Sequence, residues 1–345
     1  MNRVAGRMSF CTIADTLFLS RALALYGSLL KHSPDFCLFV LCVDDFTERT
    51  VAGLRHIEAI PLAALAAADP GFRNVRDSRT PLEYCCTAKP VLLLHLFERF
   101  PEIDVLTYID ADMFFFSDPA AILTELGTAS ILVTGYDAAA DPGKLAGRYN
   151  AALVVFRQNA DSMNCLATWR EQCLEWCFKR REERGFLDQK YLNEWPARFG
   201  SARVSEHTGI NAGRRHIVGR AITAADGAIL VDGVRLICFH FHSVLVIRSF
   251  LFHSSITQHT PDHPWKIATS VIYFPYLREL RKAILSSNCC APEAHRSIAW
   301  QMEVGGLVIV FGGVCLEIYT PKLIASLRRI KRLVTGRAEP GSPAG

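Results

Sequence analysis

A chain of 345 residues is long enough for one large domain with additions, or for two modest domains. Half of its residues are hydrophobic and 21% are charged, which excludes a disordered protein and predicts a sizeable core. The net charge of +4 is small and no basic run is interleaved with aromatic residues, so nucleic-acid binding is disfavoured.

The cysteines and the N-terminus indicate the compartment. Twelve cysteines lie mostly inside apolar runs without paired CxxC spacing, and we expect them to be small core residues in a reducing environment. No signal-peptide apolar region follows the N-terminus, and no run reaches the roughly 18 apolar residues of a membrane-spanning helix. These features predict a cytoplasmic protein, with peripheral attachment to the inner face of the membrane as an option.

The first hundred residues alternate between strand-like and helix-like patterns. Residues 8–14 and 36–43 are short apolar runs typical of strands, and each is followed by apolar residues at helical spacing. This alternation predicts a parallel sheet with crossover helices, an α/β fold. Ligands bind such sheets beyond the carboxyl ends of the strands, so Asp15 and Asp44 are candidate ligand-binding residues. The alternative is that each carboxylate caps a helix or a turn.

A longer helix is expected from about Arg79 to Phe100. Pro90 should kink it or open it locally, which would leave Arg79 and Lys89 near its exposed end. Both cations are candidates for binding a diphosphate. The alternative is a solvated surface charge, which is the commoner fate of such residues.

The strongest chemical signal lies in residues 104–119. Residues 104–109 form a run typical of a buried strand, and the run ends in Asp110 and Asp112. Alternate residues of an extended chain face the same side, so both carboxylates can point at one place. They would repel each other there unless a cation or a proton lay between them, and carboxylate oxygens suit Mg²⁺ or Mn²⁺. An acidic turn with both side chains in water is the alternative.

Further polar groups occur in the second hundred residues. A strand is expected to begin around Asn150, and Asp188 and Gln189 stand side by side at the start of a helix. The intervening loop, 137–148, is rich in Ala, Asp, Pro and Gly and is predicted to be a mobile segment over the site. The apolar and aromatic stripe of the helix 165–180 is expected to be core packing.

A strand predicted at residues 236–243 contains alternating imidazoles. Cys238, His240 and His242 would share one face of this strand. Three such ligands could hold a tetrahedral Zn²⁺, and a zinc-activated water would make the protein a hydrolase. That alternative leaves Asp110, Asp112 and the Asp188–Gln189 pair without a role.

Taken together, the motifs resemble those of the GT-A nucleotide-sugar glycosyltransferases, in particular the retaining group that includes glycogenin and the bacterial lipopolysaccharide galactosyltransferases. The matching segments are residues 108–112, 149–151, 187–192 and 239–242, within about residues 8–250. The resemblance implies a GT-A (Rossmann-like), mostly parallel sheet with helices on both faces. Beyond it we expect a helical C-terminal extension over 251–337 and a disordered tail over 338–345.

The resemblance also implies a function. It implies transfer of a hexose from a nucleotide diphosphate sugar, UDP-linked by analogy, to a glycan or lipid-linked acceptor with retention. A Mn²⁺ or Mg²⁺ ion would stabilise the charge on the departing diphosphate. A sugar-nucleotide-binding protein without catalytic activity is a further alternative.

The same resemblance assigns roles to individual residues. The metal ligands would be Asp110, Asp112 and one histidine, His240 being the better candidate and His242 the second. The sugar nucleotide would also contact Asp15, Asp44, Arg79, Lys89 and Asp110, and the transferred sugar would contact Asn150, Asp188 and Gln189. The glycine that usually follows the histidine in this family is absent, because Ser243 follows His242.

The C-terminal region ends in a strongly basic segment. Within residues 319–337, apolar residues recur at helical spacing and most lysines and arginines fall on the other face. A basic amphipathic helix of this kind can lie on an anionic membrane surface. The alternative is a helix packed on its own domain with a solvated basic face.

Overall fold

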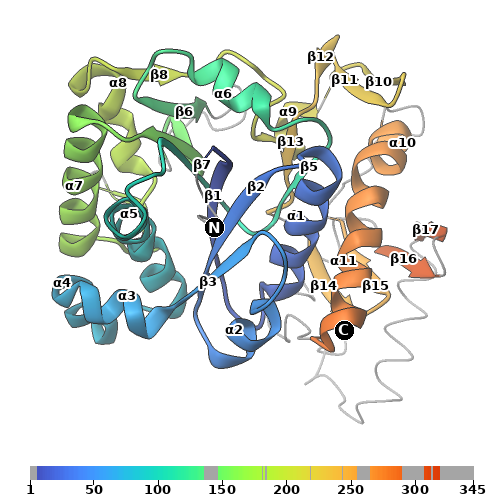
Figure 1. Cartoon of the computed structure of the whole chain (residues 1–345). Coiled ribbons are helices and arrows are strands. Elements are labelled where there is room, and N and C mark those ends of the chain that lie inside the picture. The colour runs from blue at the N-terminus through green and yellow to red at the C-terminus, as the bar shows by residue number, and fades with distance from the viewer. Residues whose placement is uncertain are drawn as a thin grey trace, which may run out of the picture.

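A seven-stranded sheet forms the centre of the molecule (Figure 1). The computed structural model describes residues 6–135, 147–180, 182, 185–217, 219–242, 244–254, 265–289, 307–311 and 314–318. In spatial order the strands are β3 (Ile57–Pro61), β2 (Phe36–Cys42), β1 (Met8–Ala14), β4 (Val105–Ile109), β7 (Tyr149–Arg157), β6 (Ile131–Gly135) and β8 (Ala202–Val204). Neighbouring strands are parallel except that β7 is antiparallel to both β4 and β6. The predicted α/β fold with a mostly parallel sheet is therefore confirmed.

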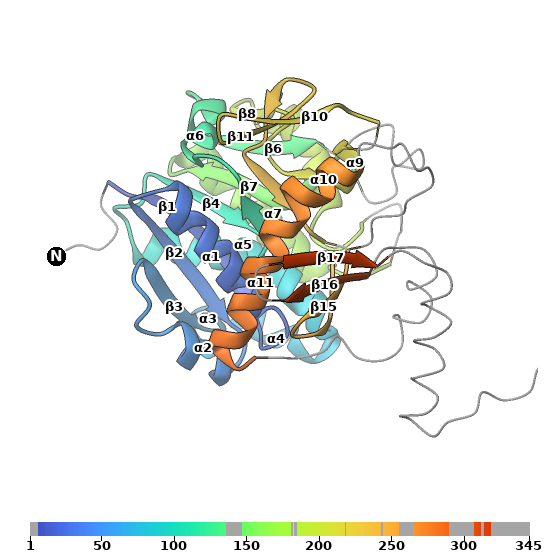
Figure 2. The ribbon, with the colours of Figure 1, turned by 90° about the vertical axis from the view of Figure 1, so that its right-hand side faces the viewer.

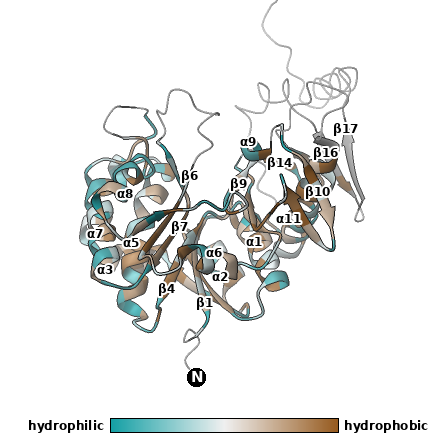
Figure 3. Cartoon of the chain, turned by 90° about the horizontal axis from the view of Figure 1, so that it is seen from above, coloured by the Kyte–Doolittle hydropathy of each residue, from teal (hydrophilic) through white to brown (hydrophobic). Residues whose placement is uncertain are grey.

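Helices cover both faces of this sheet, which explains why its strands are continuous apolar runs. Every residue of β2 is buried, as expected for a strand covered on two sides. One face packs against α3 (Leu62–Ala68), α4 (Pro70–Asn74), α5 (Pro81–Arg99) and α7 (Ala160–Glu175). The other face packs against α1 (Leu19–His32), α2 (Asp45–Val51) and α6 (Ala120–Leu126). Viewed from above, the strands β4 and β7 are mostly hydrophobic, whereas teal, polar residues lie on the outer helices (Figure 3).

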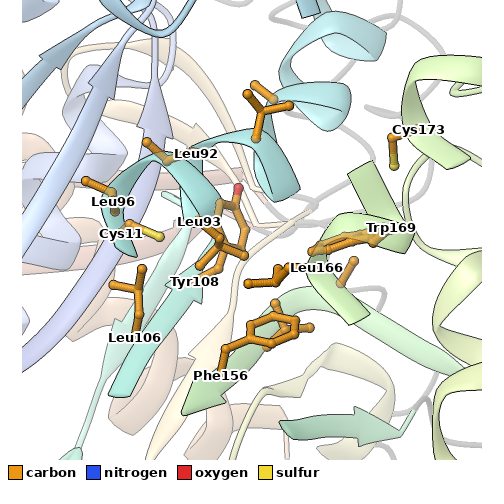
Figure 4. Packing of buried hydrophobic residues seen from close by; sticks show 14 of the residues in the cluster. Cys11, Leu92, Leu93, Leu96, Leu106, Tyr108, Phe156, Leu166, Trp169 and Cys173 are labelled. Atoms are coloured by element: carbon orange, nitrogen blue, oxygen red, sulfur yellow. The ribbon is translucent and has the colours of Figure 1, made fainter. Parts of the chain in front are cut away.

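The core between α5, α7 and the sheet supports the polar site described below. Leu93 of α5 and Trp169 of α7 are fully buried there and lie near Phe156 and Tyr108 of the strands (Figure 4). The rings of Trp169 and Phe156 stack with centroids 6.4 Å apart. The apolar stripe predicted for the helix 165–180 is thus core packing, as expected, although the helix ends at Glu175.

Helix α5 begins as predicted but does not open at its proline. Thr80 and Glu83 form a capping box at its start, in which each side chain accepts a backbone amide of the other residue. The helix continues through Pro90 to Arg99. The expectation that Pro90 leaves Lys89 near an exposed end was wrong, because Lys89 lies at mid-helix and is only 7% exposed.

A small second sheet joins segments that are distant in the sequence. It contains β5 (Met113–Phe115), β13 (Cys238–His240) and β9 (Ala212–Gly213), in that order. Strand β13 is antiparallel to β5 and parallel to β9. Its register places His240 opposite Met113, and the amide of Phe241 donates to the carbonyl of Asp112. This sheet therefore sets the histidine beside the acidic turn.

The remaining elements lie after the two sheets or connect their strands. Short helices α8 (Trp195–Arg198) and α9 (Arg214–Ile217) and the 3₁₀ turns Arg76–Ser78 and Lys190–Glu194 connect the strands. Strands β10 (Ile222–Ala225), β11 (Ala228–Val231) and β12 (Val234–Arg235) form an antiparallel sheet.

The C-terminal extension contains the expected helix together with strands. Helices α10 (Trp265–Ala268) and α11 (Phe274–Ser287) flank a π-helical turn, Thr269–Tyr273, and α11 packs along α1 (Figure 2). An antiparallel sheet, which the sequence did not predict, contains β14 (Leu245–Arg248), β15 (Leu251–His253), β16 (Leu307–Phe311) and β17 (Val314–Ile318).

Several predictions fall on parts of the chain outside the described residues. These are most of the loop 137–148, the basic segment 319–337 and the tail 338–345. Within the described ranges, no helix combines the length and the apolar character needed to cross a membrane. The cysteines whose side chains are described are free thiols, and all of them except Cys85 are buried.

Candidate active site

The carboxyl ends of the parallel strands form one edge of the sheet. Asp15 follows β1, Asp44 follows β2 and Asp110 follows β4, so all three lie at this edge, as predicted. Because β7 runs in the opposite direction, its first residues, including Asn150, lie at the same edge. In α/β proteins this edge is where ligands bind.

Two carboxylates and one imidazole converge beside this edge. Ligand atoms of Asp110, Asp112 and His240 all lie within 4.8 Å of one another. Asp110 follows β4, Asp112 precedes β5, and pairing of β13 with β5 brings in His240. Carboxylate oxygens together with an imidazole nitrogen form a donor set suited to Mn²⁺ or Mg²⁺, so the residues fit the predicted metal.

Asp112 and His240 form a buried ion pair. The Oδ1 atom of Asp112 lies 3.2 Å from Nε2 of His240, and each side chain is 11% exposed. Burial alone would raise the pKa of Asp112, but the charge of His240 and their hydrogen bond lower it to about 2. Burial likewise opposes a charge on His240, yet Asp112 outweighs it and raises the pKa of the imidazole. The pair therefore favours the protonated imidazole more than a free histidine does.

Lys89 is held between two acids. Its Nζ lies 3.1 Å from Oδ1 of Asp110 and 3.1 Å from Oδ2 of Asp188, and it donates to the carbonyl of Ala151 at 3.3 Å. Burial opposes its charge, but the charges of Asp110 and Asp188 outweigh burial and raise the pKa of Lys89 well above its ordinary value. Three acceptors match the three N–H donors of an ammonium group. The sequence assigned Lys89 to a diphosphate, whereas the structure shows it binding the acids of the site.

The residues expected to contact the sugar surround one stretch of β7. Asn150 Oδ1 accepts the amide of Ala152 at 2.8 Å, and Gln189 Oε1 accepts the amide of Ala151 at 3.4 Å. Asp188 is 3% exposed, and burial raises the pKa of its carboxyl group even though Lys89 acts to lower it. The structure thus brings these predicted residues together with Lys89 and Asp110.

Asp15, Asp44 and Arg79 have local partners. Asp15 accepts the amide of Phe18 at 2.9 Å. Asp44 caps α2 by accepting the amide of Thr47 at 2.8 Å, and it also accepts the amide of Thr16 at 2.7 Å. The guanidinium of Arg79 lies 4.0 Å from the ring centroid of Phe178 and donates to a backbone carbonyl, that of Leu174, at 3.1 Å. The contacts of Asp15 and Asp44 match the capping alternative considered for them, whereas Arg79 is neither a solvated charge nor beside the candidate metal ligands.

Cys238 and His242 lie outside the ligand group. Strand β13 ends at His240, so His242 is beyond it and is exposed, with its ring centroid 5.1 Å from that of His240. The Cys238 sulfur accepts the amide of Asn211, and burial raises the pKa of the thiol to about 12. Because the described residues that converge as ligands are Asp110, Asp112 and His240, the geometry favours this group over the alternative zinc face.

Three residues of the site were not predicted from the sequence. The Tyr108 hydroxyl donates to Oδ1 of Asp110 at 2.8 Å, and Trp169 Nε1 donates to the carbonyl of Asp188 at 2.9 Å. Arg21 of α1 is 3% exposed, and its charge helps to lower the pKa of Asp112. Arg21 stands directly before the apolar residues 22–25, and nothing in this local sequence distinguished it from a surface cation on a helix.

Comparison with known proteins gives two curated relatives. YfnD of Bacillus subtilis strain 168, named as an uncharacterized protein, is 29% identical over 293 residues, which are 82% of this chain and 92% of the relative. YfnF of the same organism, also named as uncharacterized, is 30% identical over 251 residues, which are 69% of this chain and 82% of the relative. No model of a protein family matches the chain.

Solved structures with partial likeness include several glycosyltransferases. The galactosyltransferase LgtC in complex with donor and acceptor sugar analogs has a TM-score of 0.46 at 15% identity, covering 85% of this chain and 100% of that chain. The glycosyltransferase GlyE of Streptococcus pneumoniae TIGR4 has a TM-score of 0.47 at 13% identity, with 84% and 66% covered. Mouse xyloside xylosyltransferase 1 has a TM-score of 0.43 at 13% identity, with 60% and 87% covered.

Proposed function

The chain belongs to the family that includes YfnF of Bacillus subtilis, and from its site we propose that it is a metal-dependent glycosyltransferase. It moves a hexose from a nucleotide diphosphate sugar, with UDP as the expected nucleotide, to a glycan or lipid-linked acceptor. The observation that carries the proposal is the group formed by Asp110, Asp112 and His240 at the carboxyl edge of the sheet. A second acid, Asp188, is joined to that group through Lys89.

The three ligand residues would hold Mn²⁺ or Mg²⁺. When bound, such an ion supplies positive charge to the oxygens of the departing diphosphate. His240 must give up its proton to serve as a ligand, because the nitrogen facing Asp112 is the one that would bind the ion. Asp112 then stays ionised, and because a divalent ion replaces a single proton, the carboxylate of Asp110 would balance the additional positive charge.

Asp188, Gln189 and Asn150 would contact the sugar. Positive charge develops on a sugar ring as its glycosidic bond breaks, and a nearby carboxylate stabilises that charge. Lys89 fixes the carboxylate of Asp188 at 3.1 Å and so determines its position. Gln189 and Asn150 are held on the backbone of β7 through the oxygens of their amide groups. The amide nitrogen of Asn150 is consequently the donor that this residue can offer to a sugar hydroxyl group.

Nucleotide release tests the proposal. The chain is incubated with a panel of sugar nucleotides and Mn²⁺, and free nucleotide is measured; release with at least one donor, abolished by chelation and restored by Mn²⁺, is expected. Asp112→Asn should lower the rate at least about 100-fold, because it removes a charged ligand of the ion. Asp104→Asn makes the same change at an aspartate that is 74% exposed and serves as the matched control.

Three other outcomes would contradict parts of the proposal. Near-normal rates in both Asp110→Asn and Asp112→Asn would refute the metal role. Donor binding without release would favour a sugar-nucleotide-binding protein without catalytic activity. Absence of release with every donor, combined with Zn²⁺ that remains after dialysis, would favour the zinc hydrolase. Retention is inferred from the sequence resemblance, and NMR of the product anomer tests it.

A further inference from the structure

A pocket lies at the end of β6, on the side of the sheet that faces β9 and β13. Its cavity volume is about 190 Å³. Thr134 is near the end of β6, and the other polar lining residues follow β8 or belong to the segment around α9. These polar lining residues are Thr134, Ser205, His207, Thr208, His216 and Arg220. A cavity of this size is smaller than the roughly 300–1,000 Å³ of sites for whole small molecules, so it suits one chemical group of a larger ligand.

The two histidines of the pocket are oriented as hydrogen-bond donors. Nδ1 of His207 accepts the amide of Gly209 at 3.1 Å, and Nδ1 of His216 accepts the amide of Gly213 at 3.1 Å. A backbone amide can only donate, so the proton of each neutral ring is on Nε2. Nε2 is therefore the donor atom, and not an acceptor, in both imidazoles.

The charge of the pocket is positive. Among the lining residues in the described part of the chain, Arg220 is a cation and none is a carboxylate. The guanidinium of Arg220 lies 3.6 Å from Oδ2 of Asp232, whose other oxygen accepts the amide of Ala221 at 2.8 Å. This ion pair is long and half-exposed, so it neutralises Arg220 weakly. Two imidazole donors, hydroxyl groups and a guanidinium are a set that suits an anion.

The pocket adjoins the candidate metal ligands through the small sheet. Gly213, whose amide binds His216, is the register partner of His240 across β9 and β13. Asn211 donates to the hydroxyl of Thr134 at 2.6 Å, which ties the loop before β9 to the end of β6. The pocket is thus linked through β9 to the strand that carries His240, and its lining residue Thr134 is the register partner of Asn150 in β7.

We propose that this pocket binds an anionic group, a phosphate or a carboxylate, of the acceptor. The inference rests on the proposed function, because it takes the neighbouring metal group to be the place of glycosyl transfer. The acceptor is then an acidic glycan or a phosphorylated lipid-linked sugar, whose anionic group would complement a lining that holds a guanidinium and, within the described part of the chain, no carboxylate.

Inorganic phosphate is the probe for the test. It is titrated into the full-length chain, and the imidazole resonances of His207 and His216 are followed by NMR, with His56, which stacks on Phe36, as an internal control. Saturable shifts at the two pocket histidines are expected, with acetate tested in parallel to separate phosphate from carboxylate recognition. Arg220→Gln should weaken binding about tenfold and Arg220→Lys much less. Arg203→Gln, which removes an exposed cation of β8, should have no effect.

A second arm separates the acceptor from the donor. If the proposal holds, phosphate still shifts the pocket histidines when UDP and Mg²⁺ are saturating. If UDP itself produces these shifts and abolishes those of phosphate, the pocket belongs to the donor and the proposal is overturned. Absence of shifts with both phosphate and acetate, or equal loss of binding in Arg220→Gln and Arg203→Gln, would also overturn it. Failure of the proposed function is seen separately, as the absence of nucleotide release from every sugar nucleotide.

Discussion

Replacing Lys89 with methionine removes the cation that joins the two acids of the site. The ammonium lies 3.1 Å from both Asp110 and Asp188, and the Lys89 and Asp188 side chains are 9% and 4% exposed. At an effective dielectric constant of about 20, each pair at this distance gains about 5 kcal/mol before desolvation is subtracted. Desolvation offsets much of that gain, but removing one partner leaves a buried charge unpaired and costs about 3–5 kcal/mol. Methionine retains most of the apolar stem, so packing changes little.

The loss of stability should depend on pH because Asp188 would carry the unpaired charge. Burial already raises the pKa of Asp188, and Lys89 is the group that lowers it, so the pKa in the variant rises further. When the pKa of a carboxyl group is higher in the folded chain than in the unfolded chain, the folded chain holds the proton more tightly. The free energy of unfolding therefore falls as the pH rises from the unfolded pKa to the folded pKa. The Lys89→Met variant should therefore lose more stability near pH 7 than near pH 4. Adding Asp188→Asn should recover at least half of the loss at neutral pH.

Urea denaturation followed by circular dichroism measures these differences. The matched control is Lys282→Met, at a lysine of α11 that is 71% exposed and pairs with Glu279 at 2.6 Å. Exposed pairs contribute up to about 1 kcal/mol, so the control should shift the midpoint little. The reasoning is refuted if Lys89→Met costs no more than Lys282→Met, or if Asp188→Asn gives no recovery in the Lys89→Met background.

Three further substitutions test the fold around the site by the same denaturation assay. Asp44→Ala removes the acceptor of two backbone amides and should cost about 1–2 kcal/mol at neutral pH. Because hydrogen bonds hold the pKa of Asp44 below its ordinary value despite burial, this cost should disappear as the pH falls through the folded pKa; an equal cost in acid would contradict the assignment. Gly209→Ala would place its Cβ 2.0 Å from the carbonyl oxygen of Arg235, so the backbone must move and the His207 resonances should shift; an unchanged spectrum would argue against this packing. Leu93→Ala empties part of the core beneath the site and should cost about 2–5 kcal/mol, whereas a loss below 1 kcal/mol would indicate a looser core.

The sequence by itself determined the class of fold and the principal acidic groups. Short apolar runs alternating with helical periodicity specify crossover connections, and strand ends in such folds lie at one edge, so Asp15, Asp44 and Asp110 could be placed there in advance. The two-residue period of a strand predicted that Asp110 and Asp112 meet at one place. They do meet, but in the turn between β4 and β5 rather than on an extended strand. These inferences depend on the pattern of apolar and polar residues along a short segment, and this pattern can be read from the sequence alone.

Tertiary structure decided which partners those acids have. The two-residue period of a strand places His240 and His242 on the same face and does not distinguish them. In the structure β13 ends at His240, which pairs with Met113 of β5, and His242 lies beyond the strand. Lys89 and Arg21 had the local sequence of surface cations on helices, yet packing buries both. Lys89 pairs with Asp110 and Asp188, and Arg21 donates to backbone carbonyls of Leu17 and Val244. The reason is physical, because a charge is stable inside a protein only when a partner group compensates it. That partner comes from a segment distant in the sequence, and local sequence patterns do not predict where that segment lies.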